Sequence, residues 1–518
     1  MNGPIVSVTV ICFFLCTVNS IPDDYWTARA KILVGEQISM LGGQLDLKND
    51  ERIANDILMV KKRAELETFK NFSLFLPGHN FLKVRTEIQN SEVYKIIRAM
   101  PKGAVLHAHD TALVSADWIF WNVTFRPNLY ICESPKGLLK LRFFDKPNKD
   151  CPWKLLSKIR KNKRMASTIN SRIYKQMTML TNNPEVDYND VDKAWSKFIQ
   201  IFAFITPILS YKPVYEDHYY EALKDLYMDN IMYVEIRSTL PNLYELNGTV
   251  HSSLDTAMVY KKVTERFISD YPDFVGAKLI YAPSRKVDEN KFDEYLTILK
   301  ALKERLPTFL AGFDLVGQED KGEPLIVFAN KLRNLNPPID YFFHAGETDW
   351  YGSSTDENLI DAVLLGAKRI GHGYALTKHP LVMEIMKQRG IAVEVNPISN
   401  QVLNLVKDLR NHPAAQLFAN NFPVIVSNDD PGLWGSEALS YDFYLAFMGI
   451  MSQNSDLRAL KQLALNSITY SNMNAEQKNS VMILWKKKWL EKVRYRVFLL
   501  FFFSSFETKK RPLSINFV

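Results

Sequence analysis

Residues 103–110 read Gly-Ala-Val-Leu-His-Ala-His-Asp, a short apolar run followed at once by two histidines and an aspartate. The run predicts a buried β-strand over Ala104–Leu106. Residues i and i+2 of an extended segment project in the same direction, so His107 and His109 can approach one metal ion. A His-x-His pair alone is a weak signal, so further ligands must come from elsewhere in the chain.

The strand pattern recurs along the chain. Eight apolar segments are predicted as strands: Ala104–Leu106, Met232–Ile236, Ala277–Tyr281, Leu310–Leu315, Tyr341–Phe343, Arg369–Ile370, Ile391–Val395 and Val424–Val426. Most are separated by amphipathic patterns such as Leu296–Leu306 and Leu359–Ala367, which suit crossover helices. Eight such units predict an α/β fold, the (β/α)8 TIM barrel. A doubly wound open sheet shows the same alternation and is the alternative.

Polar motifs directly follow four of the predicted strands. Besides the first, they are His344-Ala345-Gly346-Glu347, Gly371-His372-Gly373 and Ser427-Asn428-Asp429-Asp430-Pro431-Gly432. Each could be a core histidine or a simple turn, but four of the nine histidines lie at the ends of three predicted strands. The carboxyl ends of barrel strands share one face, where active sites form. Three imidazoles and a carboxylate suit a catalytic zinc, so the motifs predict a metal-dependent hydrolase.

The N-terminus is predicted to be a signal peptide. Residues 5–18 are mostly apolar, and the small Ser20 and then polar residues follow, which predicts removal of residues 1–20 and secretion. The segment departs from the usual form because no Lys or Arg precedes the apolar stretch. A membrane anchor is the alternative, but the apolar stretch is too short to span a bilayer comfortably. We therefore expect an extracellular protein without a membrane span.

Cysteine and sequon content agrees with secretion. After residues 1–20 are removed, only Cys132 and Cys151 remain, and they either form a disulfide in an oxidising compartment or stay as two buried thiols. Sequons at Asn71, Asn122 and Asn247 could carry glycans on a secreted chain. Because sequons also arise by chance, they support export without establishing it.

Three regions surround or interrupt the predicted barrel of residues 99–490. Residues 21–98 have a helical pattern and predict an accessory arm, which could serve dimerisation. Residues from about 125 to 185 do not fit one βα unit and predict an insert after the first strand, stapled by its two cysteines. Residues 491–518 change in composition, and we assign them no function.

The predicted insert is strongly basic. Between Lys136 and Arg164 it holds eleven lysines and arginines against two aspartates. Such a surface either binds an anionic glycan or an acidic receptor, or is a solvated face without a partner. The whole chain carries a net charge of +7 over 518 residues, which is too mild to indicate binding to nucleic acid.

Taken together, the motifs resemble the adenosine deaminase superfamily. The matching stretches are Met100–Gly103 leading into His107–Asp110, Phe343–Thr348, Arg369–Gly373 and Ser427–Pro431. The signal peptide, the arm, the cysteine-bearing insert and Asn396–Gln401 are similar to the secreted branch, the adenosine deaminase-related growth factors. The resemblance runs from roughly residue 30 to residue 490. It implies hydrolysis of adenosine, and of 2′-deoxyadenosine, to the inosine product and ammonia, by a homodimer with one zinc ion per chain.

The resemblance also implies the catalytic roles. Zinc would be held by three histidines and one aspartate: His107, His109, His344 and Asp429. The ion activates a water molecule, which attacks C6 of the purine. Glu347 would deliver a proton to N1, and burial would favour its protonated form. His372 would either orient and deprotonate the attacking water or stabilise its charge.

Substrate contacts follow from the resemblance as well. They are Asp110, Trp195, Gly317, Trp350 and Asp430. Asp430 would hydrogen-bond N7, and the backbone at Gly317 would approach N3. Trp195 could equally be part of the core, and Trp350 could cover the purine. One departure is Ser284, where secreted relatives often have histidine, and it could alter the tolerance for 2′-deoxyadenosine.

Two other functions remain open at this point. One is a growth-factor-like ligand whose basic insert and arm engage a receptor or a glycan. The other is a related hydrolase that acts on another aminopurine, such as a nucleotide. A ligand without catalytic duty would not need Glu347, His372 and an aspartate pair together. A nucleotide enzyme would need a phosphate-binding loop, and the sequence beside the motifs contains no glycine-rich, basic loop.

Overall fold

The computed structural model describes residues 24–71, 74–135 and 137–507. The predicted signal peptide, residues 1–20, lies outside the described residues. Of the described helices, none is both long enough and apolar enough to cross a membrane.

Eight parallel strands form a closed barrel. They are β1 (Gly103–His109), β5 (Ile231–Ser238), β8 (Gly276–Tyr281), β9 (Leu310–Phe313), β10 (His344–Ala345), β11 (Arg369–His372), β12 (Ala392–Val395) and β13 (Val424–Val426). They pair in the orders β1-β5-β8-β9 and β10-β11-β12-β13. Parallel bridges from Phe313 to Tyr341 and from Ala108 to Asp429 join the two halves. The predicted (β/α)8 barrel is confirmed, and the open sheet is wrong because the strands close on themselves.

The fifth strand differs slightly from its prediction. The sequence predicts Tyr341–Phe343, whereas β10 comprises the next two residues. The predicted segment still lies in the barrel wall, because the Phe342 N–H donates to the Phe313 carbonyl and the Phe343 carbonyl accepts from the Gly371 N–H. His344 therefore lies at the carboxyl end of the fifth segment of the barrel wall.

Helices surround the barrel. They are α10 (Lys212–Met228), α11 (Ser253–Asp270), α12 (Glu289–Arg305), α13 (Leu325–Arg333), α14 (Asn358–Leu364), α15 (Pro380–Arg389), α17 (Ala414–Ala419) and α20 (Leu457–Thr469). Each has an apolar stripe, and α11 is an example with Val259, Val263 and Phe267 buried at successive turns. Its first turn is fixed by a capping box between Ser252 and Asp255.

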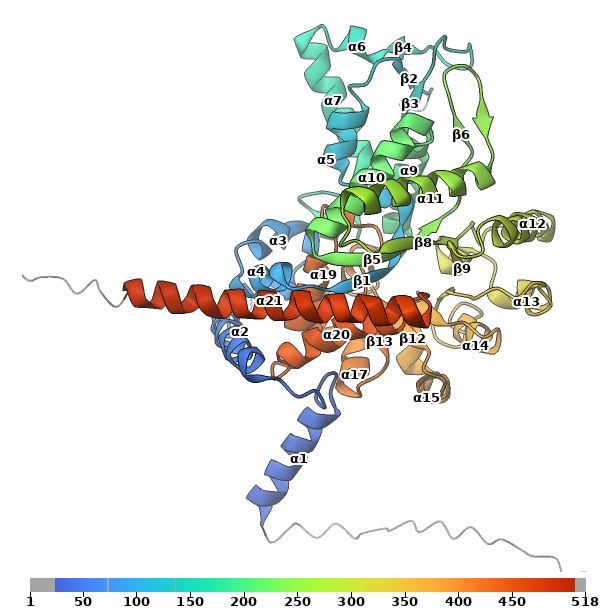
Figure 1. The fold of residues 1–518 in the computed structure, drawn as a ribbon. Coiled ribbons are helices and arrows are strands. Elements are labelled where there is room, and N and C mark those ends of the chain that lie inside the picture. The colour runs from blue at the N-terminus through green and yellow to red at the C-terminus, as the bar shows by residue number, and fades with distance from the viewer. Residues whose placement is uncertain (1–23, 72–73, 136, 508–518) are drawn as a thin grey trace, which may run out of the picture.

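The N-terminal arm is helical. It comprises α1 (Tyr25–Ser39), α2 (Asn49–Thr68), α3 (Phe81–Ile88) and α4 (Glu92–Ala99). Helix α2 packs on the long α21 (Ala475–Glu507), where the Trp489 indole donates to Glu51. Helix α1 has no buried residue and projects from the rest of the molecule (Figure 1).

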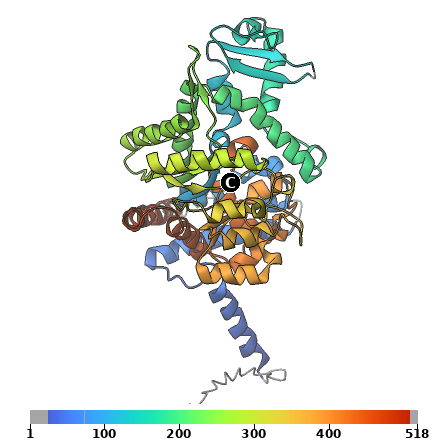
Figure 2. The ribbon, with the colours of Figure 1, turned by 90° about the vertical axis from the view of Figure 1, so that its right-hand side faces the viewer.

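An insert lies between β1 and β5. It contains α5 (Ala116–Trp118), β2 (Leu129–Glu133), β3 (Leu139–Phe143), β4 (Lys154–Leu155), α6 (Leu156–Ile159), α7 (Lys163–Met177), α8 (Pro184–Asp187) and α9 (Val191–Leu209). The three strands form an antiparallel sheet in the order β3-β2-β4, at the opposite end of the molecule from α1 (Figure 2). Cys132 and Cys151 form a disulfide with a Cα–Cα distance of 6.2 Å. The predicted disulfide is confirmed, and the alternative of two free thiols is wrong.

Smaller elements complete the two ends of the barrel. The hairpin of β6 (Leu243–Tyr244) and β7 (Val250–His251) follows β5. Helices α16 (Pro397–Val402), α18 (Pro431–Trp434) and α19 (Ser440–Leu445) follow β12 and β13. Helix α16 begins after Asn396, and α18 begins after the segment Ser427–Asp430, beside the predicted site.

Candidate active site

The predicted metal-binding side chains and the predicted catalytic residue His372 converge at the carboxyl ends of four strands. His107 and His109 end β1, His344 is in β10, His372 ends β11, and Asp429 follows β13. The Nε2 atoms of His107 and His109 lie 3.3 and 3.0 Å from Asp429 Oδ1. The ring centroid of His344 lies 4.6 Å from that of His107 and 5.3 Å from that of His109. Two ligands about 2.1 Å from a tetrahedral zinc lie about 3.4 Å apart. One donor atom each of His107, His344, His372 and Asp429 lie within 4.8 Å of one another, and Asp429 also belongs to a second such group with His109 and Asp430.

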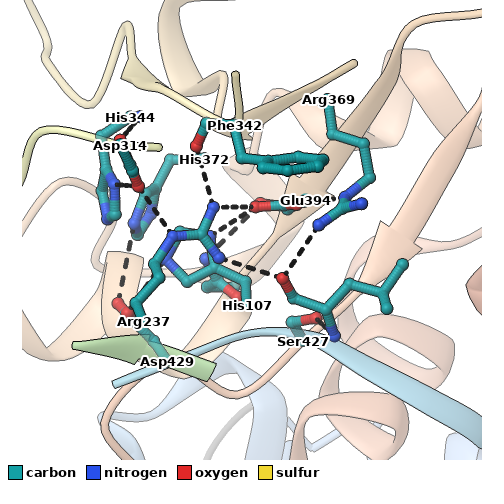
Figure 3. Close-up of polar contacts among 12 residues, drawn as sticks. His107, Arg237, Asp314, Phe342, His344, Arg369, His372, Glu394, Ser427 and Asp429 are labelled. Carbon is teal, nitrogen blue, oxygen red and sulfur yellow. Dashed lines mark hydrogen bonds and ion pairs between the residues drawn. The ribbon is translucent and has the colours of Figure 1, made fainter. Parts of the chain in front are cut away.

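His372 and Asp429 share an uncommon backbone conformation. Their φ angles are +58° and +57°, in the left-handed region that side chains with a Cβ rarely adopt. Such conformations persist where the surrounding structure fixes them, and they cluster at functional sites. Here both residues are buried, and their backbones turn at the strand ends so that the side chains point into the cluster (Figure 3).

Two of the imidazoles are held by buried carboxylates. His107 Nδ1 lies 2.7 Å from Glu394 Oε2, and His344 Nδ1 lies 2.6 Å from Asp314 Oδ2. A carboxylate accepts the Nδ1 proton and thereby leaves the lone pair on Nε2, the atom that faces the cluster. Pairing of this kind is typical of metal-binding histidines, whose affinity and orientation the carboxylate tunes.

Two buried arginines neutralise these carboxylates (Figure 3). Arg237 donates to Asp314 at 2.7 Å and to Glu394 at 2.8 Å. Arg369 donates to Glu394 at 2.5 Å and to Glu235 at 2.7 Å. Although burial opposes ionisation, the guanidinium groups hold the pKa of Glu394 well below its ordinary value. Arg237 therefore contacts both carboxylates that orient imidazoles, Asp314 beside His344 and Glu394 beside His107.

His372 has a different partner, and a chain of hydrogen bonds fixes its tautomer. The Ala414 N–H donates to His412 Nδ1, so the proton of neutral His412 is on Nε2 and points to Asn400 Oδ1 at 3.0 Å. The Asn400 amide nitrogen therefore donates to His372 Nδ1, at 3.1 Å. Because Nδ1 of His372 accepts, its own proton is on Nε2. This imidazole presents an N–H to the cluster rather than a lone pair.

The donor set fits a divalent metal ion. Nε2 of His107 and Oδ1 of Asp429 are buried atoms without a hydrogen-bond partner in the structure. Burial lowers the pKa of His344 to about 3, so its imidazole is neutral, as a metal ligand must be. Four buried carboxylates and two buried guanidiniums surround the cluster: Asp429, Glu394, Asp314, Glu235, Arg237 and Arg369. Their net charge is two negative, which one divalent cation would cancel.

Two further acids beside the cluster favour their protonated forms. Burial, and then the nearby Asp429 and Glu319 carboxylates, raise the pKa of Glu347 well above its ordinary value. Burial and the adjacent Asp429 do the same for Asp430. Glu319 also accepts from the Glu347 backbone N–H at 2.6 Å, which fixes the loop after β10. A protonated carboxyl at Glu347 can act as a general acid.

A cavity of about 230 Å³ opens from the cluster. Its apolar wall comes from α9, through Trp195, Phe198, Ile199 and Phe202. Its polar lining includes His109, Asp110, His344, Glu347, His372, Asp429 and Asp430. Gly317 lines the cavity at φ +108°, a conformation that favours glycine, and no atom lies within 4 Å of the position that a Cβ would take.

Trp350 is the one predicted contact that the structure leaves outside the cavity. Its side chain is 65% exposed, and it is not among the residues that line the cavity. The loop is held in this position by Lys378, which donates to the Asp349 and Trp350 carbonyls. All the other predicted metal, catalytic and substrate residues lie together at the cluster or along the cavity.

Comparison with known proteins agrees with this geometry. A family model described as Adenosine deaminase matches residues 172–486, and one described as Adenosine/AMP deaminase N-terminal matches residues 8–97. The chain belongs to the adenosine deaminase family. An adenosine deaminase of Phlebotomus duboscqi is 47% identical over 455 residues, which cover 87% of this chain and 88% of the relative. Adenosine deaminase 2 of Homo sapiens is 42% identical over 470 residues, which cover 89% and 92%.

Solved structures share the fold of this adenosine deaminase family chain. An amidohydrolase from Burkhoderia ambifaria with bound Zn matches with a TM-score of 0.55 at 20% identity, over 78% of this chain and 94% of its own. The Arabidopsis N6-mAMP deaminase matches with a TM-score of 0.54 at 17% identity, over 76% and 99%. At these identities the likeness concerns the barrel alone.

The residues that orient the side chains of the site were not predicted from the sequence. Glu394, Asp314 and Arg237 are not in the predicted set, and neither are Asn400 and His412. A signal exists for two of them, because Glu394 and Arg237 are charged residues inside fully buried strands, β12 and β5. A charge in such a strand must be paired, and the barrel interior is where its partner lies.

Proposed function

We propose that the chain is an extracellular, zinc-dependent deaminase that hydrolyses adenosine and 2′-deoxyadenosine to inosine or 2′-deoxyinosine and ammonia. The observation that carries the proposal is a cluster of imidazoles and a carboxylate at the floor of a cavity that also holds a protonated acid, Glu347. Membership of the adenosine deaminase family supports hydrolytic deamination. The printed names of the relatives support adenosine as the substrate.

One zinc ion per chain would be held by four residues: His107, His109, His344 and Asp429. The hydrogen bond from Asn400 argues against His372 as a ligand, because it leaves an N–H on the nitrogen that faces the cluster. When bound, zinc supplies Lewis-acid activation of a water molecule at neutral pH. The zinc bound to a structure with the same fold supports the choice of metal.

The remaining residues of the site move protons and hold the purine. Glu347 delivers its proton to N1, which makes C6 electrophilic. His372 donates from Nε2 to the attacking oxygen and stabilises its negative charge, the second of the two roles that the resemblance allows. The protonated Asp430 donates to N7, and the cavity leaves room for the purine edge at Gly317. One proton of the attacking water passes to the 6-amino group, which leaves as ammonia, and the other restores the carboxyl group of Glu347.

The direct test is incubation of the purified protein with adenosine while the absorbance of the aminopurine is followed. We expect turnover that a chelator abolishes and added zinc restores, and no turnover in a His109→Ala variant. A reaction that persists in chelator would contradict the metal-dependent mechanism. A zinc-loaded but inert protein would favour the growth-factor-like alternative.

Secretion is part of the proposal. The disulfide of Cys132 and Cys151 and the exposed sequon residues Asn122 and Asn247 support an oxidising, glycosylating route. Asn71 is exposed too, but its sequon includes residues 72–73, which lie outside the described residues. Expression in a secreting eukaryotic cell should yield a protein in the medium that begins near residue 21 and loses mass on enzymatic deglycosylation. Retention inside the cell would contradict this part.

We also propose that the arm of residues 21–98 joins two copies of the chain. Helix α1 has no buried residue, and its exposed side chains include Trp26, Ile32 and Val34. Exposed apolar side chains on a projecting helix favour a protein partner. Light scattering of the full chain should give the mass of a dimer, and deletion of residues 24–39 should give that of a monomer. An unchanged mass after the deletion would refute the arm's role.

The basic insert supports binding of an anionic glycan as a second activity. Eight exposed basic side chains lie there: Lys140, Lys146, Lys149, Lys154, Lys158, Lys161, Lys163 and Arg164. In the part of the chain that the structure describes, none of them forms an ion pair with a carboxylate. Retention on a heparin column should fall when Lys158, Lys161 and Lys163 are changed to Gln. Equal retention of both proteins would identify a solvated basic face instead.

A further inference from the structure

A second polar cavity, of about 280 Å³, lies where the N-terminal arm, the insert and the barrel meet. The arm contributes Arg85 on α3 and Arg98 on α4. The insert contributes Tyr174 on α7, and the barrel contributes Asp225 on α10 and residues between 432 and 438. The cavity at the metal cluster is lined by other residues. We call the new space the second cavity, and nothing in the proposed function uses it.

Arg85 is a charged residue in the wall of the second cavity that lacks a partner. Its Nε atom is buried and has no hydrogen-bond partner. Within the described residues, its guanidinium group forms neither a hydrogen bond nor an ion pair with a carboxylate. A guanidinium stays protonated in proteins, and a buried charged donor without an acceptor is unfavourable. The missing acceptor is either water or an anion from outside the chain.

Other charged groups of the second cavity already have partners. Arg98 pairs with Glu437, with 3.2 Å between the guanidinium nitrogen and the carboxylate oxygen. Asp229 pairs with the buried Lys102, also at 3.2 Å. These two pairs cancel their own charges and leave none for Arg85.

Two further acids line the second cavity, and neither pairs with Arg85. Asp225 favours its protonated form below neutral pH, because burial, and then the nearby Glu221, raise its pKa to about 7. Asp117 is exposed to solvent and lies beside the Tyr174 hydroxyl, whose pKa burial, and then this carboxylate, raise to about 12. At slightly acidic pH, Arg85 therefore has a charge that no group of the wall neutralises by direct contact.

The wall also offers neutral donors. The Ser115 oxygen accepts from the Trp118 N–H at 3.2 Å, so its own proton is available to a ligand. The protonated carboxyl of Asp225 is a second donor. Oxygens of a carboxylate or phosphate accept from all such groups, and a guanidinium binds them with two parallel hydrogen bonds. Acceptor-rich anions therefore suit this wall better than water alone.

We propose that the second cavity is a binding site for a small oxyanion, a carboxylate or a phosphate, which Arg85 holds. The inference does not depend on the proposed function, because the site is separate from the metal cluster. It predicts that anion binding responds to Arg85 and not to the residues of the active site.

The test is equilibrium dialysis of the full chain at pH 6 with labelled inorganic phosphate and, separately, labelled acetate. Chloride keeps the ionic strength constant. We expect saturable binding of at least one of the two anions, weakened about 10- to 100-fold in Arg85→Gln. Lys83→Gln is the matched control, because Lys83 is on the same helix and has the same charge but pairs with Glu185 outside the cavity. This control should bind as wild type does.

The outcomes separate the possible occupants. Tighter binding of phosphate would identify a phosphate ester as the class of ligand, and tighter binding of acetate an organic acid. Equal binding by wild type and Arg85→Gln would place the anion elsewhere, for example at the metal cluster, and would overturn the proposal. Absence of saturable binding would mean that the cavity holds water only, which overturns it too. If Arg85→Gln does not fold, Arg85→Lys keeps the charge without the planar pair of donors, and an unchanged affinity in that variant would count against the site.

Discussion

His107 and Glu394 are joined by a hydrogen bond of 2.7 Å between Nδ1 and Oε2, and both side chains are fully buried. The same carboxylate accepts from Arg237 and Arg369. Glu394 therefore has two duties: it orients an imidazole of the candidate metal site, and it pairs with two buried guanidiniums. The two duties can be separated by experiment.

The variant Glu394→Gln should bind zinc about 10- to 100-fold more weakly, because the amide cannot support the His107 tautomer as the carboxylate does. The measurement is competition for zinc against a fluorescent chelator. Glu235→Gln is the control, because Glu235 is equally buried and pairs with Arg369 but contacts no imidazole. Both variants should unfold at lower urea concentrations than wild type. Equal zinc affinities of the two variants would contradict the orienting duty.

Replacing Asn400 by Asp should reverse the tautomer of His372. A carboxylate at this position would accept from Nδ1, so the proton would leave Nε2 and the N–H that faces the attacking oxygen would be lost. We expect turnover to fall about 100-fold. Nitrogen NMR of histidine-labelled metal-free protein should show the protonated nitrogen of His372 change. If His372 kept its proton on Nε2 in the variant, the hydrogen-bond chain from Ala414 would not be what fixes it.

Glu347→Gln should abolish most of the catalysis and leave the metal site intact. An amide cannot deliver a proton to N1, so turnover should fall about 1000-fold, while bound zinc measured by mass spectrometry stays at one ion per chain. Asp349→Asn, an exposed position on the same loop, is the control and should keep full turnover. Substantial turnover by Glu347→Gln would assign the proton delivery to another group.

Asp225 on α10 should make the stability of the protein depend on pH. Burial, and then the nearby Glu221, raise its pKa to about 7, against about 3.9 in an unfolded chain. Between these values the unfolded chain has lost the proton and the folded protein keeps it, so the free energy of unfolding falls as the pH rises from about 4 to about 7. Asp225→Asn removes this loss and should stabilise the protein by about 1–2 kcal/mol at pH 8 and by less at pH 5. Urea unfolding at both pH values measures the difference, and an equal gain at both would contradict it.

The barrel and the cluster could be predicted because their signals are local. Each strand is a short apolar run, and the polar motif comes directly after it, as with Leu106 and His107 or Ile370 and His372. Parallel strands then bring residues from distant segments to one face. The closure of the barrel could not be derived from the strand count, since it depends on the pairing of Ala108 with Asp429.

What the sequence could not predict depends on contacts across the fold. The role of His372 follows from Asn400 and His412, which belong to a different βα unit. Trp350 is close to Glu347 in sequence, yet its loop turns outward, and spacing along the chain does not reveal the direction of a loop. The hydroxyl groups that contact Asp110 likewise include those of Tyr215 and Tyr260, which lie 105 and 150 positions further along the chain.

The wall formed by Trp195, Phe198 and Phe202 belongs to α9, which lies between the first two strands of the barrel, whereas the proposed metal ligands lie in the last residues of strands or shortly after them. Evolutionary selection for substrate size therefore acts on α9. Selection for catalysis acts on the strand ends, which are different parts of the sequence. A lineage can change α9 to admit a bulkier or smaller nucleoside without disturbing the hydrolytic machinery. The same separation gives an enzyme engineer a single helix to redesign.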